Sequence, residues 1–77
     1  MDKFTVYTQT TCSFCTKAIE LLKLSGADVE VIDIRLVDGA LAMMRTNGFK
    51  TVPQIYHGTY HVGGYGELVQ YMEAPPQ

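Results

Sequence analysis

Two cysteines are the residues of this sequence with the clearest capacity for chemistry. Cys12 and Cys15 enclose Ser13 and Phe14 in a C-x-x-C pattern. A dithiol of this spacing either cycles between thiol and disulfide or supplies half of a zinc site. A bond between the two closes a very short loop, removes little entropy from the unfolded chain and is therefore a poor structural staple.

A zinc site would need further ligands, and the chain offers two histidines. Three residues separate His57 from His61, as in a zinc finger. However, 41 residues lie between Cys15 and His57, whereas a finger has about 12–15 there. The histidines also fall on a predicted hairpin, so we interpret them as solvent-facing and favour redox chemistry over zinc binding.

The elements that position the dithiol follow from the spacing of apolar residues. Residues 3–8 alternate between two faces and predict a strand, which the polar loop of residues 9–11 follows. A helix then begins near Cys12 and ends at Ser25-Gly26, where glycine provides a left-handed cap. Its apolar stripe consists of Cys15, Ala18, Ile19 and Leu22. Residues 29–34 predict a second strand, parallel to the first after a right-handed crossover.

The second half of the chain predicts a short helix, a hairpin and a final helix. Residues 38–47 form the short helix, with Asp38 as its cap, Leu41 and Met44 facing inward and Gly48 at its end. Residues 54–56 and 60–62 are hairpin strands around the turn 57–59. The last helix follows Gly63-Gly64, has the apolar stripe Tyr65, Leu68, Val69 and Met72, and ends at Pro75-Pro76. The element order is β-α-β-α-β-β-α, in one domain spanning residues 1–77.

This arrangement distinguishes the two thiols. A helix N-terminus carries unpaired N–H groups and about half a positive charge, which favour thiolate over thiol at Cys12. The thiolate is the nucleophile in disulfide exchange. Cys15 lies one turn further along the apolar stripe, so we interpret it as the buried resolving thiol.

Two further motifs accompany the dithiol. In Thr51-Val52-Pro53 the proline suits a strand start, because it cannot donate a ladder hydrogen bond. A cis bond there would turn the Val52 backbone outward for pairing with an extended peptide, while trans is the ordinary alternative. Gly63-Gly64 permits close backbone approach and precedes a helix end that can bind a carboxylate, or it is simply a turn.

Composition excludes several classes of function. The hydrophobic fraction is 47% and the formal charge is −2. The six Lys and Arg residues do not cluster along the sequence, so nothing suggests nucleic-acid binding. No apolar run approaches the roughly 18 residues of a membrane span, and the start, Met1 to Phe4, lacks the apolar region of a signal peptide. We expect a cytoplasmic monomer.

Taken together, three blocks resemble the glutaredoxin family: residues 7–15 (YTQTTCSFC), 51–55 (TVPQI) and 61–68 (HVGGYGEL). The resemblance implies a thioredoxin-like α/β fold with a four-stranded mixed sheet in the order 2-1-3-4, three flanking helices and a cis Pro53. It also implies a glutathione-dependent oxidoreductase that reduces protein disulfides or glutathione mixed disulfides through Cys12 and Cys15. The implied glutathione-binding residues are Phe14, Lys50, Thr51, Val52, Pro53, Gly64, Tyr65 and Gly66.

Three residues depart from the family pattern. Gln9 stands where Lys or Arg often stabilises the thiolate, and Gly66 stands where Asp binds the glutathione amine, which leaves Glu67 to substitute. These two departures motivate an alternative, a hydrogen donor to ribonucleotide reductase that thioredoxin reductase reduces. Ser13 replaces the commoner Pro and motivates another, a [2Fe-2S] cluster shared by two protomers through Cys12 and glutathione.

Overall fold

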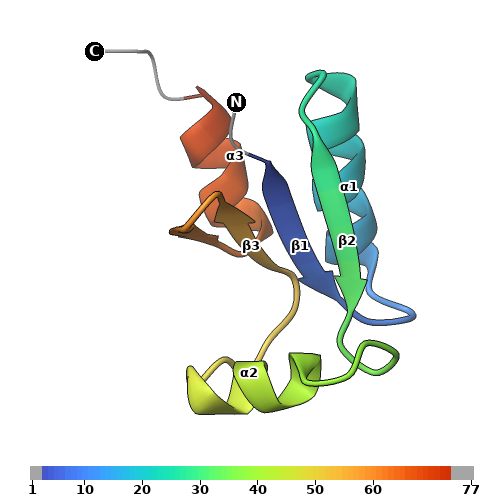
Figure 1. Cartoon of the computed structure of the whole chain (residues 1–77). Coiled ribbons are helices and arrows are strands. Elements are labelled where there is room, and N and C mark those ends of the chain that lie inside the picture. Colours follow the sequence, from blue (N-terminus) through green and yellow to red (C-terminus); the bar gives the residue numbers. More distant parts are fainter. Residues whose placement is uncertain (1–2, 74–77) are drawn as a thin grey trace.

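The computed structural model describes residues 3–73, which form one four-stranded sheet and three helices (Figure 1). The elements are β1 (Phe4–Thr8), α1 (Ser13–Leu24), β2 (Val29–Asp33), α2 (Ala40–Thr46), β3 (Gln54–His57), β4 (Tyr60–Gly63) and α3 (Tyr65–Glu73). This order confirms the predicted β-α-β-α-β-β-α. The predicted stop at Pro75-Pro76 lies outside the described residues. None of the described helices has the length and apolar character needed to span a bilayer.

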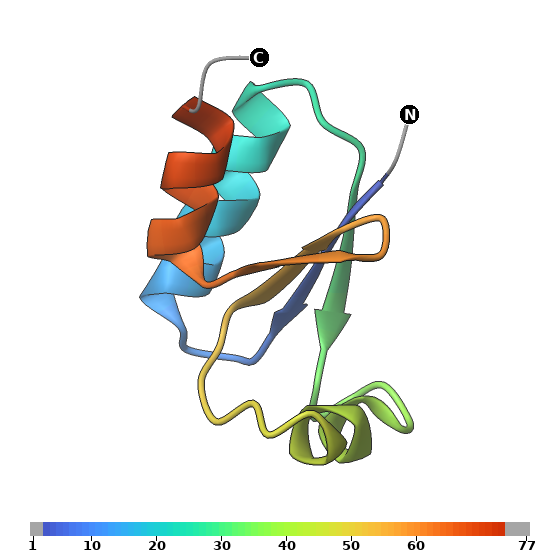
Figure 2. The ribbon, with the colours of Figure 1, turned by 90° about the vertical axis from the view of Figure 1, so that its left-hand side faces the viewer.

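The strands are arranged in the order β2-β1-β3-β4, which confirms the 2-1-3-4 sheet. β1 pairs with β2 in parallel and with β3 antiparallel, so that Val6 lies between Val31 and Ile55. Helices α1 and α3 lie side by side against one face, whereas α2 lies apart from them at the end of the sheet (Figure 2). The carboxyl end of β1 therefore meets the N-terminus of α1 near α2.

Two apolar clusters use the two faces of β1. The larger one joins the sheet to α1 and α3 and consists of Phe4, Val6, Ala18, Leu22, Ile55 and Leu68, all buried. The smaller one joins the opposite face to α2 and consists of Ile34, Ala40 and Met44, with Tyr7 and Ile32 packed against it. The predicted alternation of residues 3–8 and the predicted stripe of α1 are thus confirmed.

The start of α2 differs from the prediction. The cap residue is Gly39, with a left-handed φ of 83° and no side-chain hydrogen bond, so Asp38 lies outside the helix. Ala40 and Met44, one turn apart, fill the buried side, and Leu41 is 41% exposed. The predictions of an Asp38 cap and an inward Leu41 are therefore wrong, whereas the inward Met44 is confirmed, because Ala40 and not Leu41 shares the buried side of the helix with Met44.

The start of β1 and the end of α3 adjoin at the opposite end of β1 from the dithiol (Figure 1). The ring of Phe4 stacks on His57 at 4.1 Å and meets the ring of Tyr71 edge-on at 6.3 Å. The imidazole Nδ1 of His57 also lies 2.6 Å from the Tyr71 hydroxyl. These contacts hold the start of β1 and the end of β3 against α3.

Candidate functional site

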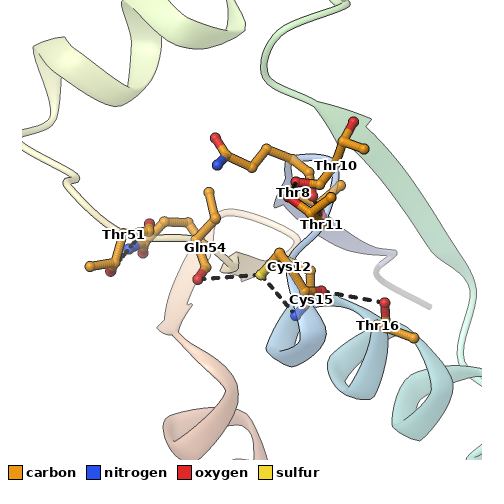
Figure 3. Close-up of a disulfide and its surroundings, with 10 residues drawn as sticks. Thr8, Thr10, Thr11, Cys12, Cys15, Thr16, Thr51 and Gln54 are labelled. Atoms are coloured by element: carbon orange, nitrogen blue, oxygen red, sulfur yellow. Dashed lines mark hydrogen bonds between the residues drawn. A yellow bond between two sulfur atoms is a disulfide. The ribbon is translucent and has the colours of Figure 1, made fainter.

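Cys12 and Cys15 form a disulfide at the junction between the loop after β1 and the first turn of α1 (Figure 3). Cys12 is the cap residue of α1, with extended backbone angles, and its Cα lies 5.2 Å from that of Cys15. Cys15 is only 2% exposed, whereas Cys12 is half-buried. The structure therefore gives the two sulfur atoms unequal access to a substrate, as the helical spacing predicts.

The surroundings of Cys12 favour a negative charge on its sulfur. The backbone N–H of Cys15 donates to Cys12 Sγ at 3.2 Å. The first turn of α1 contains no acidic residue, and the Lys17 ammonium lies 5.4 Å from the Phe14 ring centre. In the reduced protein, this donor and the positive end of the helix stabilise the Cys12 thiolate.

The segment before β3 approaches the dithiol from the other side. The carbonyl oxygen of Val52 lies 3.7 Å from Cys12 Sγ, and the Val52–Pro53 bond is cis, which confirms that prediction. Pro53 is buried, and Thr51 lies beside Gln54 rather than against the dithiol (Figure 3). An extended peptide lying along this segment would pass directly over the exposed sulfur.

One small cavity gathers most of the residues that the family resemblance assigns to glutathione. It has a volume of about 240 Å³ and is lined by Phe14, Thr51, Val52, Pro53, Gly64, Tyr65 and Gly66. The eighth residue, Lys50, lines a neighbouring cavity that shares Thr51 and Val52 with this one. The structure thus brings the residues together, and glutathione binding itself stays a prediction.

Glu67 occupies the entrance to α3. Its Oε1 accepts a hydrogen bond from the Gly64 N–H at 2.8 Å, which is one half of a capping box. The side chain bends so closely over the preceding turn that a Cβ on Gly63 would lie 3.0 Å from it. The carboxylate that was expected to bind a glutathione amine is therefore engaged by the chain's own backbone.

Gln54 was not identified from the sequence and lies directly behind the Val52-Pro53 segment. Its side chain is 8% exposed, and its Nε2 donates to the carbonyl oxygen of Thr51 at 3.0 Å. Its Oε1 lies 2.7 Å from His61 Nε2, so this nitrogen carries a proton and donates. The sequence position of a glutamine at the start of a strand does not reveal its hydrogen bonds to Thr51 and His61.

The two histidines differ in how well they match the solvent-facing position that the sequence suggested. His61 is exposed but hydrogen-bonds Gln54 and stacks on Phe49 at 4.7 Å, and His57 is half-buried against Phe4. The prediction is therefore confirmed for His61 and wrong for His57, which the ring of Phe4 from β1 partly covers. Within residues 3–73, no group of three or more His, Cys, Asp and Glu side chains is placed to hold a metal ion. Cys12 is the accessible thiol of this chain that could ligate a [2Fe-2S] cluster. Nothing else in the described residues favours binding of such a cluster.

Comparison with known proteins agrees with this geometry. A sequence model of the family described as Glutaredoxin matches residues 4–62. A probable glutaredoxin from Synechocystis sp. is 35% identical over 68 residues, which cover 86% of this chain and 77% of that protein. A glutaredoxin from Neisseria meningitidis is 37% identical over 70 residues, covering 88% of this chain and 82% of that protein.

Solved structures show the same fold. The solution structure of glutaredoxin from Brucella melitensis has a TM-score of 0.77 at 32% identity, and the match covers 95% of this chain and 80% of that one. NrdH-redoxin from Escherichia coli, described as a glutaredoxin-like protein with a thioredoxin-like activity profile, has a TM-score of 0.79 and covers 97% and 99% of the two chains. At 24% identity, this second likeness concerns the fold alone.

Proposed function

The chain belongs to the glutaredoxin family, and on this premise we propose that it is a glutathione-dependent thiol–disulfide oxidoreductase. The observation that carries the proposal is the asymmetry of the dithiol. The half-buried Cys12 sulfur caps α1 and lies beside the Val52 backbone, while Cys15 is buried one turn behind it. This is the arrangement that an attacking thiolate and a resolving thiol require.

The proposed reaction begins with the Cys12 thiolate attacking one sulfur of a protein disulfide or of a glutathione mixed disulfide. The substrate S–S bond breaks, and the departing sulfur leaves with the electron pair and takes up a proton. Cys15, as thiolate, then attacks Cys12 Sγ and releases the remaining thiol. The product is the Cys12–Cys15 disulfide that the structure contains.

Glutathione completes the cycle as the two-electron donor. One glutathione thiolate attacks Cys12 and frees Cys15, and a second attacks the resulting adduct, which restores the dithiol and yields glutathione disulfide. The cavity lined by Phe14, Pro53 and Tyr65 offers apolar walls for this tripeptide, and the Val52 backbone offers pairing for its cysteine moiety. Lys50, in the adjoining cavity, would pair with its glycine carboxylate.

A second candidate is a hydrogen donor to ribonucleotide reductase that thioredoxin reductase, not glutathione, returns to the dithiol. The specific observation in its favour is the Glu67 carboxylate on the Gly64 N–H. This negative charge lies beside the turn where the γ-glutamyl carboxylate of glutathione would bind, and like charges repel. In either case we propose a cytoplasmic location, because a dithiol that closes so short a loop cycles between thiol and disulfide in a reducing compartment. We also propose that the protein is a monomer.

Two serine variants test the roles of the thiols. Cys12→Ser removes the nucleophile and is expected to abolish deglutathionylation of a peptide–glutathione mixed disulfide. Cys15→Ser leaves the nucleophile and is expected to retain much of this activity, because glutathione alone can resolve the adduct. Equal loss in the two variants would overturn the assignment.

The reductant is tested on the wild-type protein. Turnover coupled to glutathione and glutathione reductase is compared with turnover coupled to thioredoxin reductase, with the same disulfide substrate. Faster turnover with glutathione supports the first candidate. Turnover with thioredoxin reductase alone would replace it with the second.

A further inference from the structure

A groove continues from the glutathione cavity along α2 and away from the reaction centre. Two adjoining cavities form it, with volumes of about 570 Å³ and about 480 Å³. They share Gln9, Ile34, Leu41 and Arg45, and the second also shares Thr51 and Val52 with the glutathione cavity. We call these two cavities together the basic groove, because Arg35, Arg45 and Lys50 line them.

The basic groove is connected to the reactive sulfur at two points. Val52, at one end, has its carbonyl oxygen 3.7 Å from Cys12 Sγ. Gln9 lines both of its cavities and also the hollow around Cys12 itself. A chain bonded to Cys12 that extends past Val52 therefore enters the groove without a break.

The charge of the groove is opposite to that of the whole protein. The formal charge of the chain is −2, yet Arg35, Arg45 and Lys50, three of its six basic residues, line the groove. Asp38 is the acidic residue among the lining groups. Asp33 lies close by, but its carboxylate accepts hydrogen bonds from the Arg35 N–H at 2.9 Å and from the Thr10 hydroxyl at 3.4 Å.

The basic side chains of the groove have no carboxylate partner among residues 3–73. The salt bridge present in this part of the chain joins Lys3 to Glu30, at the opposite end of β1. Guanidinium and ammonium groups without an internal counter-ion attract carboxylates from outside the chain.

The groove also offers apolar contact. Val37 and Leu41 line it with exposed fractions of 47% and 41%, and the neighbouring Leu36 is 79% exposed. The contacts proposed for glutathione run from Phe14 and Tyr65 to Lys50 and include neither Val37 nor Leu41, so these two residues stay uncovered. A longer chain is needed to reach them.

From this continuity and charge, we propose that the basic groove docks the polypeptide of a protein disulfide, with acidic and apolar residues on one side of the reacting cysteine. The proposal rests on the proposed disulfide-reductase function and names the class of substrate that the same site selects. The peptide segment would pass Val52, place its carboxylates near Arg45 and Arg35, and pack apolar side chains on Val37 and Leu41.

The test uses two synthetic peptides, each closed by one disulfide. One carries Asp and Leu beyond the reacting cysteine, and the other carries Lys and Leu at the same positions. We expect the wild-type kcat/KM to be about tenfold higher for the acidic peptide at low salt, and this ratio to fall as salt rises. Arg45→Gln should lower the ratio about twofold to fivefold, as one exposed charge pair does.

Lys23→Gln is the matched control, because it removes the same charge from the last turn of α1, outside the groove. It should leave the ratio unchanged, and an effect equal to that of Arg45→Gln would overturn the proposal. Turnover of a small uncharged disulfide, bis(2-hydroxyethyl) disulfide, is measured in parallel on the wild-type protein. If the protein reduces bis(2-hydroxyethyl) disulfide but shows no preference between the two peptides, the docking proposal alone is overturned. If the protein reduces no disulfide at all, the proposed function is overturned as well.

Analytical sedimentation at the assay concentration tests whether a second copy of the chain occupies the basic groove. A monomer is expected for wild type and for Arg45→Gln. A wild-type dimer that Arg45→Gln dissociates would assign the groove to a second copy of the chain and overturn the proposal.

Discussion

One turn of helix gives the two sulfur atoms of the dithiol different chemistry. Cys12 caps α1 and its sulfur accepts a hydrogen bond from the Cys15 N–H, so the start of the helix would stabilise a thiolate at Cys12 after reduction. Cys15 faces the sheet and is 2% exposed. The same C-x-x-C spacing thus yields one accessible and one protected sulfur, because residues i and i+3 differ in depth at a helix start.

Gln54 supports the backbone beside Cys12 without touching the sulfur. Gln54→Leu removes the hydrogen bonds to His61 Nε2 and to the Thr51 carbonyl, each of which contributes about 0.5–1.5 kcal/mol to the free energy of unfolding. Because the Thr51–Pro53 segment then loses its support, we expect KM for a disulfide peptide to rise severalfold while kcat changes little. Urea unfolding and steady-state kinetics provide the two measurements.

Gln70→Leu is the control for this variant, because Gln70 is exposed on α3 and the substitution is the same. It should change neither KM nor the free energy of unfolding. A Gln54→Leu protein that is less stable but has an unchanged KM would limit Gln54 to a purely structural role.

Tyr7 makes stability depend on alkaline pH. Burial, followed by the nearby Tyr56 phenol and Glu30 carboxylate, raises the pKa of Tyr7 above its ordinary value of 10.0. Above that value the unfolded chain releases this proton before the folded one does, so the free energy of unfolding falls as pH rises from about 10 through the higher folded pKa. We expect Tyr7→Phe to lose less stability over this range than wild type in urea titrations, and Tyr60→Phe, an exposed position, to behave as wild type.

At the scale of elements, the site depends on how α3 begins. Glu67 caps the helix that carries Gly64, Tyr65 and Gly66 into the cavity. Glu67→Ala removes the acceptor and should cost about 1 kcal/mol, which lowers Tm by about 4–8 °C in a domain of this size. Glu67→Gln keeps an acceptor oxygen and should retain most of the stability, so equal melting temperatures for Glu67→Ala and wild type would contradict the cap.

The sequence predicted the elements that depend on the local spacing of apolar residues. It did not predict the features that depend on contacts between distant segments. The α1 stripe followed from apolar spacing, and the position of Cys12 followed from the strand-to-helix junction. The start of α2 did not follow, because the packing of Ala40 against Ile34 and Met44 is a contact between segments that apolar spacing within the helix does not reveal. The hydrogen bond between Gln54 and His61 joins two strands, so the sequence position of neither residue predicted it.

At the scale of the whole molecule, folding changes the charge pattern that the sequence displays. Arg35, Arg45 and Lys50 are separated along the chain and suggested no basic cluster. The turn after β2, helix α2 and the segment before β3 place them along one groove. Counting charges along the sequence therefore missed the surface for acidic peptides that we propose.

The contact between Phe4 and Tyr71 has a consequence for attachment. It places the start of β1 and the end of α3 together, at the opposite end of β1 from the Gln9 loop and the dithiol (Figure 1). A tether, affinity tag or second protein attached at either of these positions extends away from the end of the sheet that carries the dithiol. The sulfur and its groove then stay open to solution, so the unit can be immobilised on an electrode or linked in tandem without screening the face that reacts.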